Sequence, residues 1–195
     1  MPKFGLWKMF RRYWAPLIIS CILISVALCF GIELKTTPSA RETFSLFADF
    51  PYGSLKDKNL ESHIKEVDPT LKIASSFSFD PSSSDYQTYY STWSPNCDMF
   101  LFSGEYLENK DVSEFVPLDS LGVSDGYKVN GITYGLKADL SGSIYFPNSE
   151  GTYYCFFRKT SVHLGSLDES SQSDLCLTLA KDLFRVKLPA RESSL

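Results

Sequence analysis

The feature that most limits what this chain can fold into is an uninterrupted apolar run near its start. Residues 15–32 read APLIISCILISVALCFGI, which contains no charged residue and only two serines. An α-helix rises about 1.5 Å per residue, so about 20 helical residues reach across the roughly 30 Å hydrocarbon core of a bilayer. Such a helix also satisfies its own backbone hydrogen bonds in lipid. The run therefore predicts a transmembrane anchor helix over 15–32.

The residues that flank this run predict its orientation. Residues 1–14 carry four basic side chains and no acid, and the first acid of the chain is Glu33. Cytoplasmic flanks of membrane helices are enriched in Lys and Arg. We therefore expect a single-pass protein of the cell membrane. Residues 1–14 are its short basic cytoplasmic tail, and its main domain is extracellular.

Two other interpretations of the apolar run stay open. A basic start followed by an apolar stretch also describes a cleaved signal peptide, although this run is longer than the roughly 7 to 15 residues of a signal-peptide core. Residues 18–21 (IISC) have the loose shape of a bacterial lipidation site, which would place a lipid on Cys21, or on Cys29 further along. In all three cases the rest of the chain works outside the cytoplasm.

The part of the chain after the run has the size of one domain. We expect a linker over 33–42, an extracytoplasmic domain over 43–185 and a flexible tail over 186–195. Residues 33–195 hold 15 basic and 23 acidic residues, which gives a formal charge of −8. An acidic exterior of this kind argues against nucleic acid as a partner.

Cysteine and histidine usage predicts neither a metal site nor a cofactor. Cys97, Cys155 and Cys176 stand among apolar residues, so buried thiols are favoured, although one disulfide among the three stays open. His63 and His163 are 100 positions apart and lack metal-ligand spacing, and His163 fits a structural role. No glycine-rich phosphate-binding motif is present. We expect no cofactor and no metal.

Hydrophobic patterning in the first half of the domain predicts alternating strands and helices. Apolar runs at 43–50, 71–79 and 98–102 have the length of buried strands, and the segments between them, 55–67 and 85–93, have helical spacing. Strands that are joined by helices form a parallel sheet with flanking helices. The expected fold class is therefore α/β, with ligands meeting the loops at the carboxyl ends of the strands.

The second half of the domain has a different pattern. Asn130-Gly131 lies between two β-rich stretches within 127–136, which is a strong signal for a β-hairpin. Three further elements are expected: strands at 143–146 and 152–157, and a helix with a broad apolar stripe from Asp174.

Three segments of the chain carry a family resemblance. They are residues 85–107 (DYQTYYSTWSPNCDMFLFSGEYL), 114–120 (EFVPLDS) and 132–136 (ITYGL). Together with the order of elements over 44–157, they resemble the first lobe of an extracellular solute-binding protein of an ABC importer, of the sugar-handling group. In that family the strand after the helix begins with Pro-Asp, where this chain has Cys97-Asp98, and a later segment ends in a Pro-Leu-Asp triplet.

The resemblance implies a single lobe of this fold and a role in transport. Its implied partners are the membrane, ABC permease subunits or another membrane protein, and a small solute such as a sugar. Members of the family normally close two lobes around the ligand, and a lone lobe offers one wall, so we expect an accessory or regulatory component of an importer unless a second chain supplies the other wall.

The resemblance also implies ligand-binding residues in the loops after the first and third strands. These are Asp49, Tyr52, Ser103, Glu105 and Tyr106. Carboxylates accept hydrogen bonds from sugar hydroxyls, and an aromatic face stacks on the apolar side of a sugar ring. Plainer roles stay open for the same residues: a turn former at Asp49, a solvated acid at Glu105, and packing for the two tyrosines.

A second function fits the same sequence. A domain that kept the fold but lost the ligand would act as a non-catalytic interaction or sensor module of the cell envelope. Enzyme activity is not expected, because the chain shows no supported pair of catalytic carboxylates.

Overall fold

The computed structural model describes residues 12, 14, 16–28, 37–50, 57–108, 110–147, 149–164 and 174–188. The chain divides into two compact units, Met1–Ser39 and Ala40–Leu195. In the first unit, residues 16–28 are helical. Part of the expected anchor, residue 15 and residues 29–32, lies outside the described residues. Within the described ranges, no helix combines the length and the apolar character that a membrane crossing requires.

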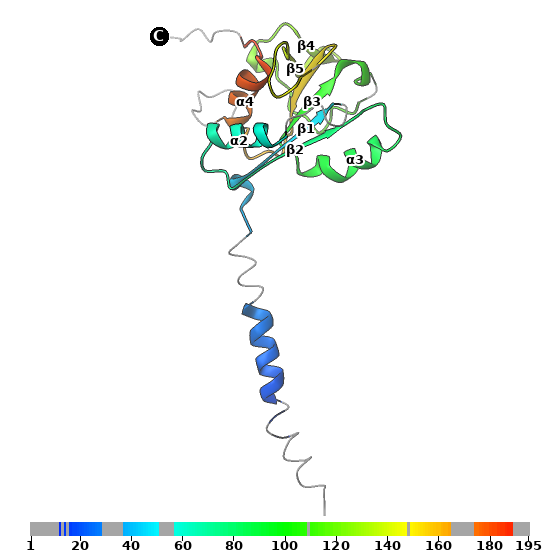
Figure 1. Cartoon of the computed structure of the whole chain (residues 1–195). Coiled ribbons are helices and arrows are strands. Elements are labelled where there is room, and N and C mark those ends of the chain that lie inside the picture. Colours follow the sequence, from blue (N-terminus) through cyan, green and yellow to red (C-terminus); the bar gives the residue numbers. More distant parts are fainter. Residues whose placement is uncertain are drawn as a thin grey trace, which may run out of the picture. The chain divides into compact units, whose positions relative to one another are not determined.

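The second unit is built on one mixed sheet of six strands in the order β2-β1-β3-β6-β5-β4 (Figure 1). The strands are β1 (Thr43–Asp49), β2 (Ile73–Phe79), β3 (Met99–Ser103), β4 (Gly126–Val129), β5 (Ile132–Ala138) and β6 (Tyr153–Phe157). β1 pairs in parallel with both β2 and β3. The pairs β3/β6, β6/β5 and β5/β4 are all antiparallel. The α/β class is therefore confirmed, but the sheet is parallel only in its first half.

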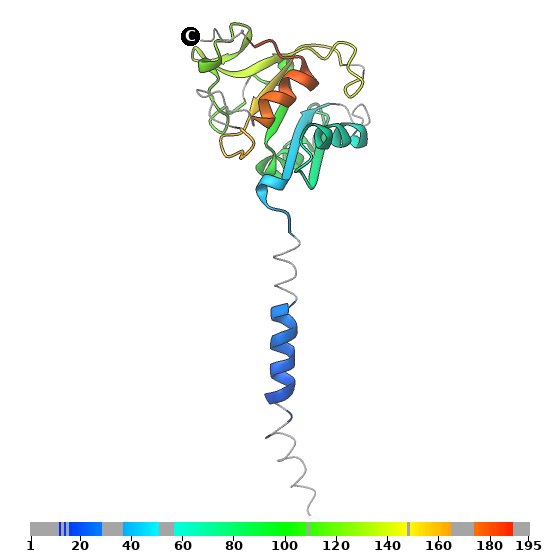
Figure 2. The ribbon, with the colours of Figure 1, turned by 90° about the vertical axis from the view of Figure 1, so that its left-hand side faces the viewer.

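Three helices of this unit cover the sheet. They are α2 (Asp57–Val67), α3 (Tyr86–Trp93) and α4 (Leu175–Phe184). α2 connects β1 to β2, and α3 connects β2 to β3, as the alternating pattern predicts. α2 and α4 lie on one face of the sheet and α3 on the other (Figure 1), and Figure 2 turns the first face toward the viewer.

Each helix on the first face buries the stripe that its spacing predicts. Leu60 and Ile64 of α2 are fully buried, and so is Leu179 of α4. α4 begins where Asp174 accepts a hydrogen bond of 3.0 Å from the backbone N–H of Leu177, which is an N-cap.

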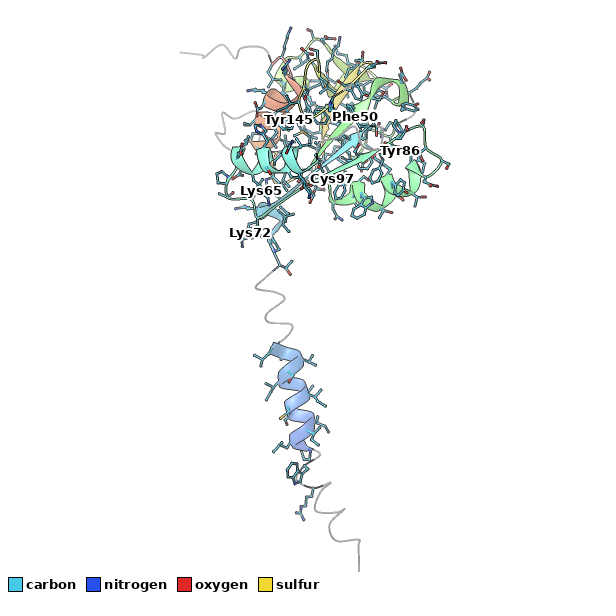
Figure 3. The ribbon with its side chains drawn as sticks, viewed as in Figure 1. Phe50, Lys65, Lys72, Tyr86, Cys97 and Tyr145 are labelled. Atoms are coloured by element: carbon cyan, nitrogen blue, oxygen red, sulfur yellow. The ribbon has the colours of Figure 1, made fainter. Side chains whose placement is uncertain are left out.

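The two faces of the sheet bury different kinds of side chain. The face under α2 and α4 is mainly aliphatic, whereas the face under α3 is aromatic. Figure 3 shows Tyr145 on the side of α2 and α4, and Tyr86 on the side of α3. The aromatic core consists mainly of Phe47, Tyr86, Phe100, Phe102, Phe115 and Phe156.

The predicted hairpin is confirmed. β4 and β5 pair on either side of Asn130 and Gly131, whose φ angles are 52° and 83°. Positive φ at both central residues is typical of the tight turn that matches the twist of a β-hairpin.

One predicted strand is wrong. Residues 144–146 form a bend, because the Ser143 hydroxyl accepts hydrogen bonds of 3.3 Å from the backbone N–H groups of both Tyr145 and Phe146. A serine side chain that binds nearby backbone groups competes with strand pairing. Phe146 is nevertheless buried, and it packs against Phe50 and Phe184.

The predictions for cysteine and for His163 are confirmed. Cys97, Cys155 and Cys176 are buried free thiols. His163 is also buried, and its Nε2 lies 2.6 Å from the backbone oxygen of Thr43 and 3.2 Å from that of Ala40. This histidine therefore connects the segment after β6 to the residues at the start of the domain.

Candidate functional site

The carboxyl ends of two neighbouring parallel strands bring most of the predicted site residues to one edge of the sheet. β1 ends at Asp49 and β3 ends at Ser103, and the two strands pair in register up to Ala48 and Leu101. Parallel strands place their carboxyl ends at the same edge, which is where ligands bind in open α/β sheets.

The turn that follows β3 carries two further predicted residues. A 3₁₀ turn over Gly104–Tyr106 holds Glu105 and Tyr106, both exposed, with Tyr106 at 46%. Tyr52, the fifth predicted residue, lies outside the described residues. The edge therefore combines a buried part, formed by Asp49 and Ser103, with an exposed part on the turn.

Asp49 has a different environment from that of a simple turn former. Its side chain is only 1% exposed, and Oδ1 accepts a hydrogen bond of 2.5 Å from the Tyr86 hydroxyl. The other oxygen, Oδ2, is buried, and no described residue forms a hydrogen bond of normal geometry with it. Burial raises the pKa of Asp49 to about 6, although Lys110, Tyr86 and the Ser103 backbone act in the opposite direction.

Lys110 lies next to this pair and comes from the irregular loop after β3. Its ammonium donates a hydrogen bond of 3.1 Å to the hydroxyl oxygen of Tyr86. The same ammonium lies 3.2 Å from the centroid of the Phe102 ring and 4.5 Å from that of Tyr90. Burial lowers the pKa of Lys110 to about 8, against the opposing effect of Asp49 and Glu114.

We call the three rings around this ammonium, those of Phe102, Tyr86 and Tyr90, the aromatic cage. The ammonium lies 5.5 Å from the Tyr86 centroid, so all three rings are within the range of cation–π attraction. Tyr86 and Tyr90 are one turn apart on α3 and stack at 6.1 Å, and Phe102 is a fully buried residue of β3. The cage is thus built on regular elements, whereas the cation in it comes from a loop.

A second carboxylate lies on the far side of the cage. The Tyr90 hydroxyl donates a hydrogen bond to Glu114 Oε1, and Glu114 Oε2 forms an ion pair of 3.0 Å with Arg158 Nη2. Burial raises the pKa of Tyr90, and the hydrogen bond and negative charge of Glu114 raise it further. The guanidinium of Arg158 lies over Phe100, with its Cζ 5.2 Å from the ring centroid.

The loop that carries Lys110 is held to the domain at several points. Leu107 is buried in the aromatic core, and its backbone oxygen accepts a hydrogen bond of 2.9 Å from the Tyr127 hydroxyl. Phe115, at the far end of the loop, is fully buried and bridges to Arg158. Between these anchors, Glu108 and Asp111 are exposed. Val112 also packs against the aromatic core, so Lys110 belongs to a loop that is buried at alternate points.

The sequence indicates only part of the cage. The spacing of Tyr86, Tyr89, Tyr90 and Trp93 indicates an aromatic stripe, which on its own is typical of a packed helix face. Lys110 stands 20 positions after Tyr90 in a loop without periodicity, so no sequence signal connects it to that stripe.

Two surface cavities lie away from this edge. One, of about 430 Å³, is lined at the opposite end of the sheet by Ser45, Asp98 and Ser161 among others. There the Asp98 carboxylate already accepts hydrogen bonds from the Ser45 backbone N–H at 3.0 Å and from the Ser161 hydroxyl at 2.7 Å. The other cavity, of about 470 Å³, lies between β5 and the segment after α4. Asp98 thus connects β1 to the segment after β6.

The side chains at the carboxyl edge offer groups for noncovalent contacts. Aromatic faces, hydroxyl oxygens and two carboxylates are together suited to a polar or cationic group. Within the described residues, no three His, Cys, Asp or Glu side chains are grouped so that they would hold a metal ion. Comparison of the chain with family models, with curated proteins and with solved structures finds no match.

Proposed function

We propose that residues 43–185 form a single solute-binding lobe, similar to the first lobe of an extracellular solute-binding protein, that serves or regulates an ABC-type importer. The observation that carries the proposal is the meeting of Asp49 and Ser103 at the carboxyl edge of β1 and β3. The exposed Glu105 and Tyr106 on the next turn complete that edge. Open α/β sheets bind small ligands at such an edge.

We infer different roles for the predicted residues from their exposure. Glu105 and Tyr106 are exposed and would contact the solute directly. Asp49 is buried and accepts a hydrogen bond from Tyr86, so it would hold the Tyr86 hydroxyl in place behind the site. A single lobe buries only one side of a ligand, so tight binding would require a second wall from another chain.

We infer the placement of this lobe from the first part of the sequence. Residues 15–32 would anchor the chain in the cell membrane, with residues 1–14 inside and the lobe outside. An anchored lobe stays close to membrane-embedded permease subunits, which raises its effective concentration at them. The acidic charge of −8 on residues 33–195 would also favour positively charged solutes over anions.

A thermal-shift screen of the full-length chain in mild detergent tests the proposal. The panel contains sugars, amino acids, amines and peptides, each at a large excess. A ligand at 100 times its Kd stabilises a protein by about 2.7 kcal/mol, which is a shift of several degrees for a domain of this size. We expect one solute class to raise the melting temperature.

Matched variants show whether such a shift arises at the carboxyl edge. Glu105→Ala and Tyr106→Ala are expected to abolish the shift. Glu66→Ala should retain it, because Glu66 is exposed on α2, on the face of the sheet opposite α3 (Figure 1). A cooperative melt that no solute moves would rule out solute binding by the isolated chain. A shift that survives both edge variants would place the site elsewhere.

A protein-binding module is the second candidate, and one surface favours it. Trp93 of α3 stacks on Phe77 of the edge strand β2 at 4.7 Å, and Tyr89 stacks on Phe79 at 4.5 Å. Trp93 is 41% exposed and Tyr89 is 39% exposed. Exposed aromatic side chains that lie side by side are typical of protein interfaces. Photo-crosslinking from position 93 in cells would yield a discrete adduct if this surface has a constant partner, and none otherwise.

A further inference from the structure

The contact that carries this inference is the position of the Lys110 ammonium inside the aromatic cage. A loop residue places a positive charge against three rings that belong to β3 and α3. Aromatic cages of this kind are the usual way in which proteins recognise ammonium ligands. The described structure therefore has the form of a cation site that is occupied by a side chain of the same chain.

The hydroxyl groups of the cage are oriented to favour a cation. Tyr86 donates its proton to Asp49, and Tyr90 donates its proton to Glu114. Each phenol oxygen therefore keeps its lone pairs as acceptors, and the oxygen of Tyr86 accepts from Lys110. The two carboxylates lie behind the phenols and add negative potential without occupying the cage.

Lys110 is not an ideal occupant of this cage. Its lowered pKa, about 8, shows that burial costs the ammonium more than the surrounding carboxylates return. A primary ammonium is strongly hydrated, and a quaternary ammonium gives up less hydration on entering the same space. A ligand of the second kind would therefore replace Lys110 at a smaller desolvation cost.

We propose that the aromatic cage of Phe102, Tyr86 and Tyr90 binds the ammonium group of an organic cation, and that the Lys110 side chain fills the cage until such a ligand displaces it. This inference rests on the proposed function, because it names the solute class for the same carboxyl edge. Sugars lack the positive charge that the cage is built to hold.

The first experiment restores the missing atoms of a truncated lysine. Lys110→Ala removes three carbons and the ammonium, which n-propylammonium supplies. In the full-length chain at pH 7 and constant ionic strength, n-propylammonium and tetramethylammonium are expected to raise the melting temperature of Lys110→Ala in a saturable way. Uncharged n-propanol should have no such effect. The apparent Kd for tetramethylammonium should be at least tenfold lower in Lys110→Ala than in the wild type.

A matched variant ties that effect to the cage. Lys110→Ala/Tyr90→Leu keeps an apolar side chain at position 90 but removes one ring of the cage, and it should lose the saturable shift. Lys110→Ala/Tyr89→Leu removes a ring of the same helix that stacks on Phe79 outside the cage, and it should keep the shift. A shift that persists in the Tyr90 variant would overturn the assignment.

The second experiment measures displacement in the wild type and does not depend on any variant folding. Amine acylation at pH 8, read peptide by peptide by mass spectrometry, reports how accessible Lys110 is. Tetramethylammonium is expected to increase acylation of Lys110 several-fold. The exposed Lys181 of α4 is the internal control and should not change. An unchanged rate at Lys110 would overturn the proposal even if Lys110→Ala bound the cations.

The two proposals fail in different ways. A sugar or peptide that shifts the wild type through Glu105, while neither cation affects Lys110→Ala or Lys110 acylation, would overturn the cation site and leave solute binding in place. A chain that melts cooperatively and responds to no solute and no cation would overturn both.

Discussion

The Tyr86 hydroxyl donates a hydrogen bond of 2.5 Å to Oδ1 of Asp49, and this contact joins the first turn of α3 to the end of β1. It is made inside an aromatic core, where an ionised carboxylate is costly. The contact therefore connects the electrostatics of the candidate site to the stability of the domain, and it leads to the first two predictions.

Asp49→Asn is expected to stabilise the protein at neutral pH. The folded pKa of Asp49, about 6, is raised from 3.8, so its favourable contribution is complete below about pH 3.8 and is lost as the pH rises through about 6. An uncharged Asn avoids that loss. The rise in the pKa of Asp49 from 3.8 to about 6 corresponds to a gain in stability of about 3 kcal/mol for Asp49→Asn at pH 7.5, as an upper limit. Urea unfolding at pH 4 and pH 7.5 measures the difference, which should shrink toward pH 4.

Asp139→Asn is the control of opposite sign. Hydrogen bonds from Ser141 lower the pKa of this exposed carboxyl, so its contribution is present at neutral pH and is lost in acid. The substitution should lower stability slightly at pH 7.5. If the free energies of unfolding of Asp49→Asn and Asp139→Asn changed with pH in the same way, the burial of charge at Asp49 would be contradicted.

Tyr86→Phe should raise the pKa of Asp49 above about 6. The change removes the hydrogen bond to the carboxylate and the acceptor for Lys110 while keeping the ring. Leaving a buried carboxylate oxygen unpaired costs about 1 to 3 kcal/mol at neutral pH, and less once Asp49 is protonated. Carbon-13 titration of the Asp49 carboxyl measures the pKa, and urea unfolding measures the stability.

Tyr89→Phe is the matched control for this change. Tyr89 lies on the same helix, is 39% exposed and stacks on Phe79. Loss of its hydroxyl should change stability by less than about 0.5 kcal/mol. An Asp49 pKa that is the same in Tyr86→Phe and the wild type would show that the hydrogen bond does not act on the carboxylate.

Two glycines of β5 and its hairpin are expected to differ in how they tolerate a methyl group. A Cβ on Gly135 would lie 2.7 Å from the ring of Phe156, which is fully buried and cannot easily move away. Overpacking of this kind costs about 1 to 3 kcal/mol. A Cβ on Gly131 would have no atom of the other described residues within 4 Å, apart from its chain neighbours, so only the φ of +83° opposes the change, which costs about 1 kcal/mol. Urea unfolding should rank Gly135→Ala as the more damaging variant, and the reverse order would contradict the packing.

Cys97, Cys155 and Cys176 should react with iodoacetamide only after the domain unfolds. All three are buried, and burial raises the pKa of Cys97 to about 12 and those of the other two well above the ordinary value. Because the thiolate is the reactive form, the native thiols are inert near neutral pH. Peptide mass spectrometry with and without urea follows each cysteine separately. Fast labelling of any of the three in the native state would contradict its burial.

The sequence alone determined the elements whose signals are local. The Asn130-Gly131 turn, the apolar run of β1 and the stripes of α2 and α4 each depend on neighbours within a few positions. The family resemblance placed Asp49 and Ser103 in the loops after the first and third strands, and the structure has them as the last residues of β1 and β3. The local pattern failed at 143–146, where the Ser143 side chain competes with strand pairing.

Only the tertiary structure decided which of these elements meet. β6 inserts between β3 and β5 and pairs antiparallel with both, which no local pattern encodes. The cage likewise depends on contacts between Phe102, Tyr90 and Lys110, which come from a strand, a helix and a loop. The position of a loop cation is determined by the rings that attract it and by the burial that opposes it. Both act through space rather than along the chain, and for that reason Lys110 carried no signal in the sequence.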